Sequence, residues 1–326
     1  MSLTNRLKST VSHLAGRECA GHVYRMVIEI TNVCNLTCIM CPRGGMKRKA
    51  QHMKRELYTE IIRENHRCLE FVGLNGFGEP LLHPNLFELL DVCRTHQVQT
   101  GISTNCTRLD EETARALLDN PPDQITLAVD GITKDNYEKV RNGAQFEVVM
   151  ENVTRFLRLR EERKTRPFVV LQCIYMTETK EQVRDFRRFF ASYRYDAIRI
   201  RQLTYSGNRR QDADYRNRCC SCYWLWNEPM VVSNGTVVPC CQDVNADLAL
   251  GNIGEKPLQV LWQEGRIQEL RRKHAAGERE TIPMCKACNM YQPSAMLALG
   301  AVCFNTATLN RWVPAIETRI SFARYR

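Results

Sequence analysis

The sequence contains no apolar run as long as the roughly 18 residues that a membrane-spanning helix requires. Its longest candidate, AMLALGAVCF near the C-terminus, is shorter and contains glycine. The N-terminal segment also lacks the apolar core of a secretory signal peptide. The net charge is +10, but lysine and arginine are spread along the chain and form no basic block with interleaved aromatic residues. We therefore expect no transmembrane span and no nucleic-acid partner; an anionic small substrate or an acidic redox partner explains the charge equally well.

Cysteine, by contrast, is abundant, with 16 copies in 326 residues. A secreted disulfide scaffold would be shorter and would carry a signal peptide, so the pattern indicates metal ligation in a reducing cytoplasm. The cysteines that cluster along the chain are Cys34, Cys38 and Cys41; Cys219, Cys220 and Cys222; Cys240 and Cys241; and Cys285 and Cys288.

The region from 27 to 203 alternates strand patterns with helical patterns. Six such repeats predict an α/β fold with a parallel sheet, either doubly wound or curled into a partial (β/α)6 TIM-like barrel. The expected strands are 26–31, 69–76, 98–104, 124–130, 168–175 and 197–203. The expected helices are 56–67, 85–96, 110–119, 134–164 with a break near Gly143, and 179–193. Polar residues share one strand face and would surround a ligand in a barrel; they are Glu29, Thr31, Asn75, Ser103, Asn105, Thr126, Gln172, Arg199 and Arg201.

Composition divides the chain into four parts. We expect an N-terminal extension (1–24), a partial barrel (25–206), a small cysteine-rich domain (207–292) and a C-terminal tail (293–326). The small domain begins with a polar linker and contains a hairpin turn at Asn234-Gly235. The extension places four apolar residues on one helical face, which favours a helix packed on the domain over one on a membrane surface; they are Leu3, Leu7, Val11 and Leu14.

The segment ITNVCNLTCIMCPRGG contains Cys34, Cys38 and Cys41 in the spacing C-x3-C-x2-C. A closed zinc site or an ordinary four-iron cluster needs four ligands, so one coordination position is left over. One alternative is a zinc site completed by a histidine, of which His52 is the nearest. The loop resembles that of the radical S-adenosylmethionine (SAM) enzymes. The resemblance implies a [4Fe-4S] cluster whose fourth iron binds SAM.

Two further segments extend this resemblance. LNGFGEPLLHP resembles the family's glycine-rich segment, which implies that Gly76, Gly78 and Glu79 hold the SAM amino group. Glycine permits the close approach of backbone to ligand. ISTNCT resembles the strand end that contacts the SAM ribose, which implies roles for Ser103 and Asn105.

LAVDGITKDNYEKVRNG resembles the family segment whose arginine pairs with the SAM carboxylate, which implies that role for Arg141. Ala128 stands where the family commonly has serine, so one hydrogen bond to that carboxylate is in doubt. Met40, between the second and third cysteines, matches the apolar position beside the adenine.

The second cysteine region resembles the SPASM or shorter twitch extension of radical SAM enzymes, which binds auxiliary [4Fe-4S] clusters. The resemblance implies one closed cluster, because Ser294 stands where the two-cluster version has a further cysteine. Structural zinc is the alternative, and Cys219, Cys220 and Cys241 are competing ligands. The ligands favoured by spacing are Cys222, Cys240, Cys285 and Cys288.

Together these resemblances imply a cytoplasmic radical SAM oxidoreductase. A 5′-deoxyadenosyl radical would abstract hydrogen from a small polar substrate held by Arg199 and Arg201. The reaction we favour is two-electron dehydrogenation of a sugar-like or aminocyclitol-like alcohol, with the auxiliary cluster as electron acceptor. A flavodoxin or ferredoxin-type protein would donate the first electron.

Three other functions are considered. An epimerase would return hydrogen from a thiol, and Cys106, Cys241 and Cys303 are unassigned. A ribosomal-peptide-modifying enzyme is disfavoured because only about 25 residues precede the first strand, too few for a leader-binding domain. A non-enzymatic iron–sulfur protein would not need the glycine-rich and Arg141 segments.

Overall fold

The centre of the molecule is one nine-stranded sheet in a computed structural model that describes residues 2–164, 167–204, 221–286, 288–290, 295–304, 308–309, 311–313 and 316. The strands are β1 (Arg25–Ile28), β2 (Phe71–Gly73), β3 (Gln99–Thr104), β4 (Gln124–Ala128), β5 (Phe168–Tyr175), β6 (Ala197–Gln202), β7 (Met230–Val231), β8 (Thr236–Val238) and β9 (Gly251–Asn252).

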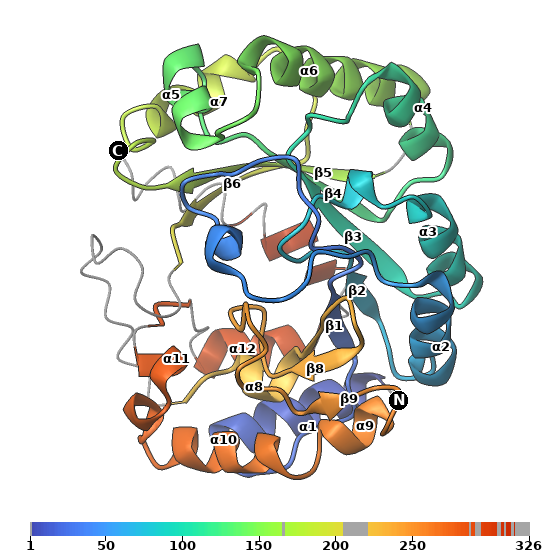
Figure 1. Ribbon diagram of the computed structural model, residues 1–326, viewed down its shortest axis with the longest axis vertical. Helices are drawn as coiled ribbons and strands as arrows, with labels where there is room; N and C mark the ends of the chain where they lie inside the picture. Colours follow the sequence, from blue (N-terminus) through green and yellow to red (C-terminus); the bar gives the residue numbers. More distant parts are fainter. Residues whose placement is uncertain are drawn as a thin grey trace.

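The strand order is β6-β5-β4-β3-β2-β1-β7-β8-β9. The first six strands are parallel, because each is joined to the next by a helical crossover. They form an arc that does not close (Figure 1). This confirms the predicted partial barrel rather than a flat doubly wound sheet.

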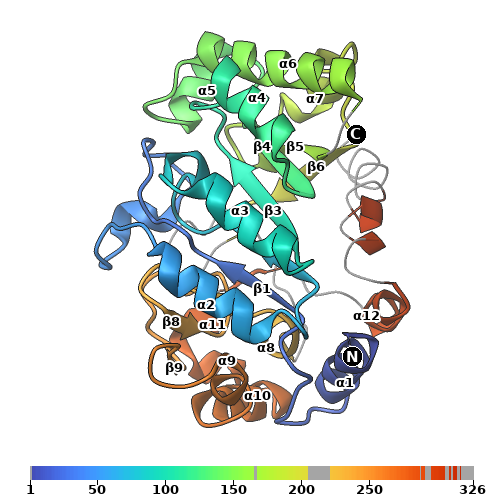
Figure 2. The same ribbon diagram turned by 90° about the vertical axis from the view of Figure 1, so that its right-hand side faces the viewer.

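Helices cover the outer side of the arc (Figures 1 and 2). The helices are α1 (Ser2–Leu14), α2 (Arg55–Asn65), α3 (Leu86–Thr95), α4 (Glu111–Asp119), α5 (Lys134–Val140), α6 (Phe146–Arg163), α7 (Val183–Phe189), α8 (Trp224–Asn227), α9 (Leu258–Leu261), α10 (Arg266–Ala275), α11 (Pro283–Lys286) and α12 (Ala295–Val302). Alternate strand residues such as Met26 and Ile28 are fully buried beneath them. None of the helices within the described ranges is long and apolar enough to cross a membrane.

The strand register brings the predicted polar residues to one face. Residues paired across a sheet share a face, and residues two apart in a strand do so too. Ser103 pairs with Thr126, and Gln172 pairs with both Ala128 and Arg199. The expected common face is therefore confirmed for the polar residues that lie within the strands.

The cysteine-rich region continues the barrel sheet at its β1 edge. β7 runs parallel to β1, and β8 returns antiparallel to β7 through the predicted hairpin. Gly235 adopts a φ of +88°, a left-handed conformation that glycine tolerates without steric cost. The predicted linker (207–218), together with Cys219, Cys220 and Ser294, lies outside the described residues.

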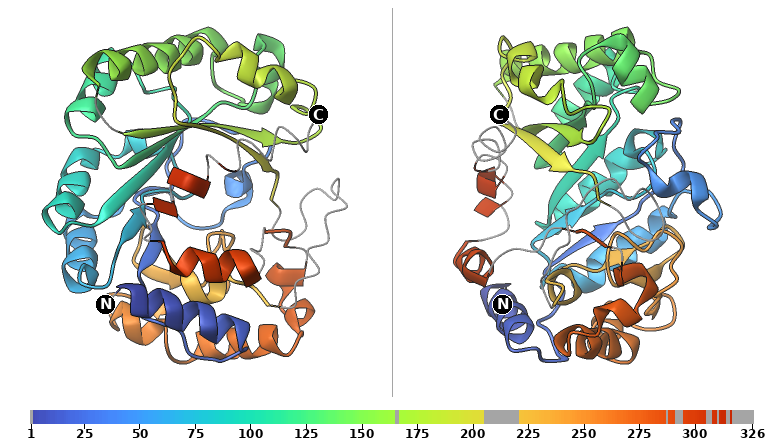
Figure 3. Two further views of the ribbon diagram at one scale, coloured as in Figure 1. Left: turned by 180° about the vertical axis from the view of Figure 1, so that it is seen from behind. Right: turned by 90° about the vertical axis from the view of Figure 1, so that its left-hand side faces the viewer.

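Helix α1 packs on the domain, as expected, but through the opposite face. It contacts α8 and α12 (Figure 3). Its buried side is polar: Ser9 Oγ accepts from Gly21 N at 3.0 Å, and Arg6 pairs with Glu70 at 2.9 Å. The predicted burial of the apolar stripe is wrong, because these polar contacts fix the helix rotation. Leu3, Leu7, Val11 and Leu14 remain 54%, 48%, 38% and 41% exposed.

Candidate functional site

The loop after β1, drawn in blue in the middle of Figure 1, contains Cys34, Cys38 and Cys41. All three are half-buried; we call residues 34–41 the three-cysteine loop. Backbone bonds anchor it to the end of α5, where Thr37 N donates to Asn142 O at 3.0 Å and Ile39 N to Val140 O at 3.1 Å. The loop conformation is therefore set by its own backbone contacts.

The environment of these thiols fits a cationic cluster. Burial raises the pKa of Cys34 and of Cys38, so their neutral forms are favoured until positive charge arrives. Bound iron supplies that charge and stabilises the thiolates. Within the described ranges, no three His, Cys, Asp or Glu side chains are arranged to hold one metal ion. His52, the proposed zinc ligand, instead has its ring against His83, with centroids 5.3 Å apart.

The glycine-rich segment docks directly on the start of the three-cysteine loop. A Cβ added to Gly78 would lie 2.4 Å from the Thr31 carbonyl oxygen, so only glycine fits there. At Gly76 it would lie 2.6 Å from the Glu29 side chain. Glu79 N donates to Val33 O at 2.9 Å. Both predicted glycines thus serve close backbone packing, and their contact with SAM stays a prediction.

The Glu79 carboxylate is buried and accepts two backbone hydrogen bonds. Asn105 N donates to Oε2 at 2.7 Å, and Leu81 N donates to Oε1 at 3.1 Å. Burial raises the pKa of Glu79, whereas the Asn105 amide opposes that rise. Each carboxylate oxygen can accept a second bond, so the predicted contact with the SAM amine is compatible with this geometry. The Asn105 side chain donates to Asn35 Oδ1 at 3.2 Å.

Arg141 lies beside Cys38 and forms a buried ion pair with Asp130. The sequence reasoning did not predict this pair. Arg141 Nε donates to Asp130 Oδ2 at 2.8 Å, and its Nη1 lies 3.8 Å from Cys38 Sγ. Asp130 Oδ1 accepts from Ile174 N at 2.7 Å, which ties the pair to β5. The arginine is therefore held beside the cysteine loop by Asp130. Its predicted pairing with the SAM carboxylate remains untested.

The remaining predicted site residues belong to the three-cysteine loop and to the inner face of the sheet. Met40 packs against Val140, Met176 and Leu203. Ser103 is half-buried on the inner face of β3. Arg199 and Arg201 pair with Gln172 and Ile174 of β5, so both belong to the inner face. Arg201 is exposed and Arg199 is half-buried.

A second ion pair missed by the sequence reasoning joins the barrel to the cysteine-rich region. Arg48 Nη1 and Nη2 donate to the two oxygens of Glu29 at 2.6 and 2.8 Å. Arg48 Nε also donates to Val244 O at 2.7 Å, and Ser233 N donates to Glu29 Oε1 at 3.3 Å. Sequence separation hid this pair, although a glutamate inside an apolar strand was a signal that it needed a partner.

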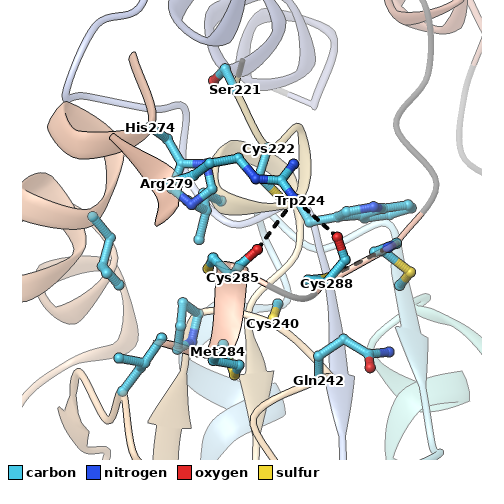
Figure 4. A pocket seen from close by; sticks show the side chains of 15 residues that line it. Ser221, Cys222, Trp224, Cys240, Gln242, His274, Arg279, Met284, Cys285 and Cys288 are labelled. Carbon is cyan, nitrogen blue, oxygen red and sulfur yellow. Dashed lines mark hydrogen bonds between the residues drawn. The ribbon is translucent and has the colours of Figure 1, made fainter. Parts of the chain in front are cut away.

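The four cysteines favoured by spacing line one cavity, which we call the four-cysteine cavity (Figure 4). Arg279 Nη2 donates to the carbonyl oxygens of Cys285 at 3.3 Å and Cys288 at 3.1 Å, which holds the C-x2-C turn. Cys241 packs elsewhere, against Met230, Val232 and Val238. The cysteines lining the cavity are Cys222, Cys240, Cys285 and Cys288.

The cavity is chemically suited to a closed cluster. Burial raises the pKa of Cys285 to about 12 and that of Cys240 well above its ordinary value, so here too the thiolates need bound cations. Four thiolates satisfy all four irons of a cluster and leave no open position. His274 also faces the cavity; burial, Arg279 and His13 lower its pKa to about 4.

Comparisons with known proteins match two segments of the chain. Residues 28–190 match the model of the radical SAM superfamily. Residues 219–289 match that of SPASM, an iron–sulfur cluster-binding domain. Streptococcus suis SuiB bound to S-adenosylmethionine superposes with a TM-score of 0.65 at 15% identity, over 81% of this chain and 71% of that one. This likeness shows the shared fold.

Curated relatives cover the chain to different extents. The S-adenosyl-L-methionine-dependent 2-deoxy-scyllo-inosamine dehydrogenase of Niallia circulans is 24% identical over 272 residues, which is 80% of this chain and 91% of that protein. Mycofactocin maturase MftC of Mycobacterium ulcerans is 31% identical over 118 residues, which is 36% of this chain. That match spans only 32% of the maturase.

Proposed function

The chain belongs to the radical SAM superfamily and has a SPASM domain, and on this premise we propose that it dehydrogenates an alcohol on a small sugar-like or aminocyclitol-like substrate. Its cofactors are SAM and two [4Fe-4S] clusters. When bound, they supply a 5′-deoxyadenosyl radical and an electron acceptor. The substrate carbon would lose one hydrogen atom to the deoxyadenosyl carbon; the hydroxyl group on that carbon would then lose its proton to solvent, and the substrate radical would lose one electron to the auxiliary cluster. The net change is alcohol to ketone, a two-electron oxidation.

The observation that carries this proposal is the convergence of four cysteines on one cavity. Four ligands leave a cluster there no iron at which substrate could bind. Its chemistry is then limited to electron transfer or to stabilising the fold. An electron acceptor is what the second half of a dehydrogenation requires. The dehydrogenase from Niallia circulans, which matches this chain over most of both lengths, supports the same reaction class.

The inner face of the sheet supports a polar substrate. Gln172 and Arg199 pair across β5 and β6, and Arg201 lies two residues further along the same face. Arginine presents a planar fork of donors that suits carboxylate, phosphate or paired hydroxyl oxygens. We propose that at least one of the two guanidinium groups orients the substrate below the SAM site.

The chain also needs a supply of low-potential electrons. We propose a flavodoxin or ferredoxin-type donor in the cytoplasm, where thiols stay reduced. A net charge of +10 would favour an acidic donor protein.

Epimerisation is the second candidate, because one thiol lies near the inner face. Cys106 is fully buried in the core, and Cys303 is exposed outside the arc's strands. Cys241 packs near Val27 of β1 and Phe77 of the glycine-rich segment. A thiol there could return a hydrogen atom to the opposite face of a substrate radical.

Product analysis separates these functions. The reconstituted enzyme is incubated anaerobically in D2O with SAM, a reductant and a panel of aminocyclitols and polyols. Dehydrogenation yields a product that lacks two hydrogens, whereas epimerisation yields an isomer that gains one deuterium from the exchanged thiol. Release of 5′-deoxyadenosine that depends only on added peptides would overturn the proposal.

A further inference from the structure

His274 is a buried polar side chain with no partner among the residues that the structure describes. It lies on α10 and is only 3% exposed. Neither Nδ1 nor Nε2 has a hydrogen-bond partner there. An imidazole always carries at least one N–H, and buried donors are rarely left unpaired in native proteins. The residues that the structure describes therefore supply no acceptor for this N–H.

The cavity that the His274 ring lines indicates where such an acceptor would bind. His274 lines the four-cysteine cavity (Figure 4). Ser221 and Gln242 also line the cavity and carry acceptor oxygens, but neither makes a hydrogen bond to the His274 ring. Seven of the other fourteen lining residues have apolar side chains that offer no strong acceptor; they are Trp224, Leu225, Pro239, Leu248, Leu270, Met284 and Met290. A cluster bound in this cavity would bring sulfide and thiolate sulfurs, which carry negative charge and accept hydrogen bonds.

We propose that His274 donates an N–H hydrogen bond to a sulfur of the auxiliary cluster and thereby raises its reduction potential. A donor directed at cluster sulfur offsets part of the negative charge that the cluster gains on reduction. Arg279 has a different part, because its Nη2 is directed to the carbonyls of Cys285 and Cys288. His274 is thus a tuning residue for electron acceptance rather than an iron ligand. This inference depends on a cluster in the cavity and not on the identity of the substrate.

Three variants of the full-length reconstituted enzyme test the proposal. His274→Phe removes the N–H while filling the space, and His274→Gln retains an N–H donor. Met284→Leu is the matched control, since it alters the same cavity wall without removing a donor. The auxiliary cluster is followed by redox titration with electron paramagnetic resonance. Its signal is assigned in a variant with alanine at all three cysteines of the three-cysteine loop.

The expected result is a lower potential in His274→Phe, with the reduced-to-oxidised ratio at a fixed ambient potential falling about three- to tenfold, the net effect of one hydrogen bond. His274→Gln should recover part of this loss, and Met284→Leu should match the parent. Pulsed resonance on enzyme with 15N-labelled histidine should show weak nitrogen coupling to the reduced cluster, absent from His274→Phe.

Three outcomes would overturn the proposal. The first is an unchanged potential in a His274→Phe variant that retains its iron. The second is an equal shift in Met284→Leu, which would indicate general packing. The third is read on the parent enzyme, so it stands even if His274→Phe loses its cluster: either no histidine coupling or a strong one typical of direct iron ligation.

Discussion

Substitution of Arg48 by methionine should strongly destabilise the folded protein. Its guanidinium makes a bidentate pair with Glu29, a side chain with no exposed area, and a third bond to Val244 O. Methionine has a similar length but donates no hydrogen bond. Arg48→Met would therefore leave the Glu29 carboxylate buried without its counter-charge.

The expected loss in the free energy of unfolding follows from the burial of Glu29. Removing one partner of a buried ion pair typically costs about 3–5 kcal/mol, because the other charge remains desolvated. Phe77 N and Ser233 N also approach Glu29, but at 3.4 and 3.3 Å these weak bonds replace little of the loss. A Glu29→Met, Arg48→Met double variant should cost less than the sum of the two single changes, since no uncompensated charge is left.

The assay is anaerobic urea unfolding of reconstituted proteins with equal iron content, comparing midpoints and slopes. Arg55→Met is the matched control: Arg55 pairs with Glu88 at 2.6 Å, but the side chains are 53% and 49% exposed. Such an exposed pair should contribute about 0–1 kcal/mol. If Arg48→Met were no more destabilising than Arg55→Met, the assigned role of the buried pair would be refuted.

Three further predictions concern the metal sites and the substrate. Alanine at all three cysteines of the three-cysteine loop should lower the iron content from about eight to about four per chain and abolish SAM cleavage, as measured by iron analysis and 5′-deoxyadenosine release. The double change Cys285→Ala, Cys288→Ala should leave SAM cleavage in a folded protein but yield little oxidised product; a normal product yield would exclude the electron-acceptor role. Arg199→Met or Arg201→Met should reduce kcat/KM about 10- to 100-fold through loss of a charge-assisted bond to substrate, with 5′-deoxyadenosine formation in the absence of substrate unchanged. Unaltered steady-state kinetics in both arginine variants would remove them from the substrate site.

Sequence alone determined the features that depend on short separations. Cysteines at C-x3-C-x2-C and C-x2-C spacing are close together in any fold, so the metal chemistry that they predict can be inferred from a short segment. The alternation of strand and helix patterns likewise predicted the parallel arc, because each crossover places neighbouring strands side by side. The break of the long helical pattern at Gly143 appears between α5 and α6, where Gly143 has a φ of +95°.

Pairings between distant residues were decided only by the tertiary structure. Glu29 with Arg48, and Asp130 with Arg141, are recognised as partners once the loops are placed over the sheet. Nothing in the sequence indicated that His274 of α10 would line a cavity together with cysteines from three other segments. No pattern of residue types along the chain specifies which of these side chains come into contact.

Helix α1 shows the physical reason most directly. Its apolar stripe predicted which side would be buried, since apolar burial usually dominates packing. The structure instead buries Ser9 and Arg6, which find partners in Gly21 and Glu70. The periodicity of a sequence predicts which face of a helix is apolar. Which face is buried also depends on the part of the protein against which the helix packs. That part is assembled from residues far along the chain, so only the folded structure determines it.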